Sequence, residues 1–155
     1  MLELWIDGLL DRFDFSMKKF CLHFACLSLM LIATAVQAAD VVLVVGKQSP
    51  IESLSRNEVE DIFQGKITRL PNIDKITPFD RGEDSLRQQF YATYTGKTLS
   101  QVKAYWARII FTGRGYPPKT VGLEELKAAL RNNPGAIGYM TADNVDDTLR
   151  IIRLN

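Results

Sequence analysis

The sequence has one histidine and two cysteines, and all three lie between residues 21 and 26. That short region belongs to a predicted secretory signal peptide, residues 17–38, with a basic start, an apolar stretch and small residues before a cleavage position after Ala38. Residues 39–155 then contain no thiol, no imidazole and no disulfide. This excludes Ser-His-Asp hydrolases, cysteine proteases and ordinary zinc sites, so we expect no enzyme, no catalytic or metal-binding residues and no cofactor.

The apolar stretch of the predicted signal, residues 20–35, is shorter than the roughly 20 residues that a transmembrane helix needs. We therefore expect a cleaved signal and export to the periplasm. Residues 1–16 carry four acidic side chains ahead of a signal whose start should be basic. The simpler interpretation is a start-site extension, with translation beginning at Met17; an amphipathic helix over residues 1–16 is the alternative.

Regular elements alternate along residues 39–155, which have the length of one domain. A β-branched run at 41–45 predicts a strand buried on both faces, as in a parallel sheet. Ser55 and Glu58 form a capping box for a helix that Gly65 ends. Later elements are a helix from Thr98 or Ser100, a Gly/Pro-rich loop over 111–119, a helix over 123–130, and strands over 136–140 and 149–154. This alternation predicts an α/β fold with a mostly parallel sheet flanked by helices.

The centre of the chain predicts a strand, a polar turn and the start of a helix. Residues 76–79 are typical of a strand, and either Asp84 or Ser85 can cap the helix that follows. Apolar side chains then recur on one helical face: Leu86, Phe90 and Tyr94. A helix that begins where a strand ends presents free backbone N–H groups with a partial positive charge, which suits an oxyanion.

Side chains in this turn allow two interpretations. Arg81 and Arg87 bracket it and Ser85 adds a hydroxyl, so the turn is a candidate anion site. The same turn also carries three acidic residues: Asp80, Glu83 and Asp84. These can pair with the two arginines on the surface, and they repel an anion. Residues 39–155 carry sixteen basic and fourteen acidic side chains. This nearly even balance gives no reason to expect a nucleic-acid partner.

Two other motifs carry a resemblance to a known family. Residues 54–68, LSRNEVEDIFQGKIT, and residues 133–139, NPGAIGY, resemble stretches of the periplasmic phosphate-binding proteins, the substrate-binding components of phosphate ABC transporters. The motifs stand in the family's order and frame the central turn. The resemblance implies a lobe of the type II periplasmic binding-protein fold, over essentially all of residues 41–154, with an oxyanion site.

The resemblance also implies site residues. In the family, the turn before the central helix reads Arg-Ser-x-x-Ser-Gly-Thr, and its arginine, hydroxyls and backbone N–H groups hold phosphate. Arg81 matches that arginine and Ser85 the later serine, whereas Gly82 stands where the first serine would be. Leu86 and Arg87 replace the glycine and threonine. The expected ligand-binding residues are therefore Arg81, Ser85, and Leu86 and Arg87, the last two through their backbone N–H groups.

Length is the main departure from the family. A full member closes two lobes over its ligand, whereas residues 39–155 suffice for one. A ligand on one lobe stays half solvated, so we expect weak anion binding, or none, from the monomer. Two functions stay open. One is an exported binder of phosphate or a similar oxyanion that feeds an ABC transporter permease or informs a membrane sensor. The other is an interaction module, with weak or no ligand binding, that docks a membrane sensor, a channel or a second copy of itself.

Overall fold

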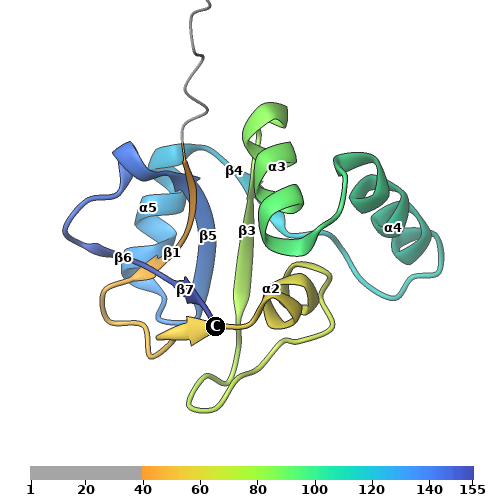
Figure 1. Cartoon of the computed structure of the whole chain (residues 1–155). Coiled ribbons are helices and arrows are strands. Elements are labelled where there is room, and N and C mark those ends of the chain that lie inside the picture. The colour runs from red at the N-terminus through yellow and green to blue at the C-terminus, as the bar shows by residue number, and fades with distance from the viewer. Residues whose placement is uncertain (1–39) are drawn as a thin grey trace, which may run out of the picture. The chain divides into compact units, whose positions relative to one another are not determined.

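A five-stranded sheet with the order β4-β3-β5-β1-β6 runs through the described part of the chain, residues 40–155 of a computed structural model (Figure 1). Its strands are β1 (Val41–Gly46), β3 (Thr77–Arg81), β4 (Lys119–Val121), β5 (Ala136–Thr141) and β6 (Leu149–Ile151). Two short strands, β2 (Ser53–Leu54) and β7 (Arg153–Leu154), form a separate parallel pair. The predicted start-site extension and signal peptide, residues 1–16 and 17–38, lie outside the described residues.

The direction of the strands confirms a mostly parallel sheet, with one exception. β3 is parallel to both β4 and β5, whereas β1 is antiparallel to its neighbours β5 and β6. The run at 41–45 is thus buried, as predicted, but it is not a parallel strand. Burial on both faces comes from helices on the two sides of the sheet, and it therefore does not report a strand's direction.

Helices cover both faces of the sheet (Figure 1). They are α2 (Arg56–Phe63), α3 (Asp84–Phe90), the π-helix η1 (Tyr91–Thr95), α4 (Leu99–Phe111), α5 (Leu123–Asn132) and the short 3₁₀-helix η2 (Ala142–Asn144). α5 packs on β1 and β5 from one side, and α3 packs on β1, β3 and β5 from the other, continuing into η1 against α2. The predicted α/β fold class with flanking helices is confirmed.

Helix starts follow the sequence signals except at the central helix. Ser55 and Glu58 form the predicted capping box of α2, and Thr98 forms another with Gln101 at the start of α4. At α3, however, the N-cap is Glu83, which makes no side-chain capping bond. The prediction that Asp84 or Ser85 caps this helix was therefore wrong. Glu83 lies in this position with its carboxylate bound elsewhere, to Arg81.

Two regions differ from the sequence prediction. The predicted loop over 111–119 ends in the edge strand β4, because Lys119 pairs with Phe79 on β3. The predicted last strand over 149–154 breaks at Ile152, and its two parts join different sheets. The NPGAIGY motif has a packing reason: a Cβ on Gly135 would lie 2.1 Å from the carbonyl oxygen of Lys75, so only glycine fits there.

An aromatic cluster holds α3 and η1 on the sheet. The rings of Phe90 and Tyr139 stack with centroids 3.9 Å apart, and Phe63 and Tyr91 pack around them. These side chains are buried, and Phe90 lies on the apolar helical face predicted from the sequence. The cluster packs the end of α3 and η1 against α2 and β5, and the hydroxyls of Tyr91 and Tyr139 reach Asp80 on β3, beside the candidate anion site. No helix within residues 40–155 is long and apolar enough to cross a bilayer.

Candidate functional site

The end of β3 carries a buried carboxylate, Asp80, at the centre of a polar network. One oxygen of Asp80 accepts the N–H of Arg81 at 2.9 Å and the hydroxyl of Tyr139. The other oxygen accepts from the Arg87 guanidinium at 2.9 Å and from the Tyr91 hydroxyl at 3.3 Å. The carboxylate is therefore paired and hydrogen-bonded, as a buried charge must be. One of the two interpretations of the turn had Asp80 pairing on the surface, whereas it is buried.

The Arg81 guanidinium is the second buried charge of the turn. Its side chain is only 5% exposed, and its Nη2 donates to both carboxylate oxygens of Glu83, at 2.9 and 3.0 Å. The Nε and Nη1 groups are buried and have no partner within the described residues. The side chain of Glu83 is 59% exposed. The Nη2 group of this guanidinium is thus occupied by a carboxylate on an exposed side chain.

The other predicted ligand residues lie near Arg81 and Glu83, but they differ in which hydrogen-bonding groups are unpaired. The Arg87 side chain is bound to Asp80 and to Asp84, and its backbone N–H donates to the carbonyl of Glu83 at 3.0 Å. Ser85 is exposed and Leu86 half-buried. Because Arg87 makes the first backbone bond of α3, the N–H groups of Ser85 and Leu86 precede the helical hydrogen-bond ladder.

The interpretation in which the acidic residues of the turn pair with its arginines agrees in part with the structure. All three acids pair with the two arginines, in the combinations Arg81–Glu83, Arg87–Asp80 and Arg87–Asp84. Two of the partners, Asp80 and Arg81, are buried rather than on the surface. Sequence reasoning missed Tyr139 and Tyr91, since their roles depend on β5 lying beside β3 and on the pitch of the central helix. Within residues 40–155 no His, Cys, Asp and Glu side chains gather into a group that could hold a metal ion.

The two tyrosines make stability depend on pH in the alkaline range. Burial, first of all, and then the charge of Asp80 raise the pKa values of Tyr91 and Tyr139 above the usual value of about 10. A raised pKa in the folded state means that the unfolded chain loses these protons first. The stabilisation is therefore complete below about pH 10 and decreases as the pH rises above it.

We expect the free energy of unfolding to fall by up to about 1.4 kcal/mol per pH unit for each of these tyrosines above about pH 10. Urea unfolding at several alkaline pH values measures this slope. Tyr139→Phe removes one of the two groups, so its slope should be smaller than that of the parent protein. An unchanged slope in this variant would show that Tyr139 titrates alike in the folded and unfolded chains.

Comparison with known proteins defines the class of this fold. The chain matches an ABC-type phosphate transport receptor from Vibrio cholerae with a TM-score of 0.55 and 18% identity, over 74% of this chain and 45% of the other. It matches PstS from Borrelia burgdorferi with a TM-score of 0.53 and 14% identity, over 74% and 47%. A Clostridium perfringens protein, assigned as a phosphate ABC transporter substrate-binding protein and crystallised with bound phosphate, gives 0.54 and 21%, over 74% and 44%. The fold is that of one lobe of a type II periplasmic binding protein.

The family follows from the sequence match. Residues 27–151 match the family model described as a PBP superfamily domain, so the chain belongs to that family. This confirms the resemblance that the two motifs carried. The chain spans less than half the length of each of the three solved structures. No curated protein matches it in sequence. The family and the structures of similar fold are binding proteins rather than enzymes.

Proposed function

We propose that this protein is an exported binding protein that holds phosphate or a similar oxyanion at Arg81, in the service of an ABC transporter. The observation that carries the proposal is the buried guanidinium whose Nε and Nη1 groups have no partner within residues 40–155. A buried donor without an acceptor is costly. A tetrahedral oxyanion offers several acceptor oxygens at once, and guanidinium groups bind such anions through two parallel hydrogen bonds.

The carboxylate of Glu83 supports the proposal because it is an anion that already pairs with this guanidinium. It is an anion on an exposed side chain, and both of its oxygens accept from the same nitrogen, Nη2. We infer that phosphate displaces it and adds contacts to the backbone N–H groups of Ser85 and Leu86. The hydroxyl of Ser85 lies on the same exposed turn.

A single lobe supplies every contact of the proposed site, and this limits affinity. Each charge-assisted hydrogen bond contributes about 1.5–3 kcal/mol, and part of the ligand stays in water. Two such bonds correspond to a dissociation constant on the order of 1 mM. Isothermal titration calorimetry of the purified protein with phosphate, sulfate and chloride tests the function. Saturable binding of phosphate in preference to chloride supports it; no binding of any tested oxyanion at low ionic strength overturns it.

Glu83→Gln is expected to tighten phosphate binding by about fivefold, because the variant removes the carboxylate that competes for Arg81. This corresponds to about 1 kcal/mol, the upper range for a partly exposed ion pair. The matched control is Asp84→Asn, which makes the same charge change one residue away but at a carboxylate bound to Arg87. If both variants tighten binding equally, the effect is one of general charge, and Glu83 is not a competitor.

A further inference from the structure

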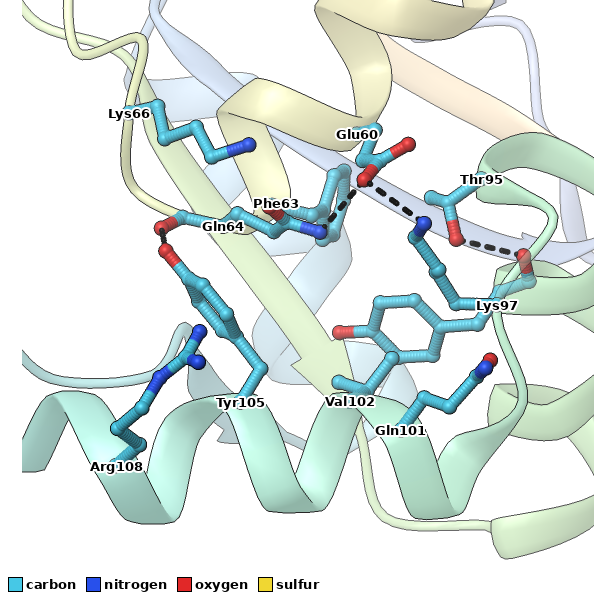
Figure 2. Close-up of a pocket in the computed structure, with 11 residues that line it drawn as sticks. Glu60, Phe63, Gln64, Lys66, Thr95, Lys97, Gln101, Val102, Tyr105 and Arg108 are labelled. Atoms are coloured by element: carbon cyan, nitrogen blue, oxygen red, sulfur yellow. Dashed lines mark hydrogen bonds and ion pairs between the residues drawn. The ribbon is translucent and has the colours of Figure 1, made fainter.

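A cavity of about 380 Å³ lies between α2, η1 and α4, and its lining contains neither Arg81 nor Glu83 (Figure 2). Side-chain contacts join α2 and α4 across this cavity. The Tyr105 hydroxyl on α4 donates to the backbone carbonyl of Gln64, at the end of α2, at 2.9 Å. The size falls in the range of sites for small organic ligands, about 300–1,000 Å³. Because neither Arg81 nor Glu83 lines this cavity, it is separate from the candidate oxyanion site.

The interior of the cavity is largely aromatic and aliphatic. Phe63, Tyr91 and Val102 are buried in its wall, and Tyr105 is half-buried at its edge. Flat apolar surfaces of this kind favour an aromatic ring, which gains from edge and face contacts as well as from burial. The walls point to a ligand with an apolar body.

Charges at the opening are unbalanced. Three cations line the cavity, Lys66, Lys97 and Arg108, against one carboxylate, Glu60. Glu60 is already engaged, by Lys97 at 3.5 Å and by the amide of Gln64 at 2.8 Å (Figure 2).

Of the three cations that line the cavity, Arg108 is the one without a carboxylate partner among the described residues. Lys66 pairs with Asp61 at 3.0 Å, outside the cavity lining. Arg108 has no acidic partner within residues 40–155, and its guanidinium carbon lies 5.8 Å from the centre of the Tyr105 ring. In Figure 2 both side chains rise from α4 on the same side of the cavity. A guanidinium beside an aromatic face is suited to a planar carboxylate attached to a ring.

One wall is built from an unusual backbone. Residues 91–95 form a π-helix, η1, and Tyr91 and Thr95 from it line the cavity. The Thr95 hydroxyl donates to the Tyr91 carbonyl at 2.7 Å. π-helical turns are rare and occur frequently at functional sites, because they move side chains out of the regular helical register. Here the turn places an aromatic ring against the cavity while the Tyr91 hydroxyl stays on Asp80.

We propose that this cavity is a second ligand site, for a small aromatic carboxylate. The ring packs against Phe63, Val102 and Tyr105, and the carboxylate binds the guanidinium of Arg108. This site does not depend on oxyanion binding at Arg81. Its ligand differs in class from phosphate, since the apolar walls contribute most of the contact area and the charge contributes orientation and selectivity.

The test is a titration of the isotope-labelled full chain with 2-naphthoate, followed by two-dimensional NMR, with the neutral 2-naphthamide as the matched probe. We expect saturable shifts at the amides of η1 and of the first turns of α4, and at least fivefold weaker binding of the amide. Saturating phosphate should leave these shifts in place. Equal binding of the two probes, displacement by phosphate, or shifts confined to residues 80–87 would overturn the proposal.

Arg108→Gln tests the charged contact directly. Arg108 is exposed on α4, so the variant should fold, and we expect it to bind 2-naphthoate about fivefold more weakly while 2-naphthamide is unaffected. Arg114→Gln is the control, because Arg114 is also exposed but does not line the cavity. Equal losses in both variants would overturn the assignment.

Discussion

Replacing Arg81 by glutamine is expected to abolish phosphate binding, with a loss of about 100-fold or more. The guanidinium is the only buried cation in the turn without a complete set of partners among the described residues, and it supplies the charge-assisted hydrogen bonds of the proposed site. Losing two such bonds removes roughly 3 kcal/mol or more of binding free energy. Calorimetry in the Glu83→Gln background measures this loss best, because binding starts from a higher affinity there.

Two controls make the Arg81 result interpretable. Arg114→Gln removes the same side chain from an exposed loop and should leave phosphate binding unchanged. Arg81→Lys keeps the positive charge but loses the planar fork, so it should bind phosphate more weakly than the parent and more strongly than Arg81→Gln. Circular dichroism and thermal unfolding confirm that each variant is folded. Phosphate binding that survives in folded Arg81→Gln would contradict the proposed site.

The fold could be predicted from the sequence because its signals are local. The capping residues Ser55 and Thr98 and the apolar spacing of Phe90 and Tyr94 act within a few residues of chain, and the structure agrees with them. The direction of β1 could not be predicted, since its burial would be the same in either direction. The edge strand β4 was missed because its three residues become a strand only by pairing with β3.

The candidate site was predicted less completely, for a physical reason. Arg81 could be named as a candidate because a charged residue at the end of a strand and before a helix is visible in the sequence. The burial of Arg81 could not be predicted, and neither could the burial of Asp80 beside it. Both depend on the ring of Tyr139 and on the helix that carries Tyr91, which reach Asp80 from 59 and 11 residues away along the chain. Long-range partners of this kind leave no pattern in the sequence around the turn.

Asp80→Asn is expected to lower the free energy of unfolding by about 3 kcal/mol. The change leaves the Arg87 guanidinium, 19% exposed, without its buried charged partner, and an amide N–H₂ now faces donors from Arg87 and Tyr91. Breaking a buried ion pair by removing one partner costs about 3–5 kcal/mol. The lower end applies here because Arg87 can be partly hydrated. Urea unfolding at neutral pH, with the slope compared between variants, measures the loss.

Asp84→Asn is the matched control for this prediction. Asp84 pairs with the same arginine at 3.3 Å, but its side chain is 68% exposed, so water replaces the lost contact and we expect a change below about 1 kcal/mol. A double-mutant cycle with Arg87→Met isolates the Asp80–Arg87 interaction. Equal destabilisation by Asp80→Asn and Asp84→Asn would contradict a structural role for the buried pair. A large coupling energy would instead show that Asp80 holds the Arg87 guanidinium, which is then not free to bind a ligand.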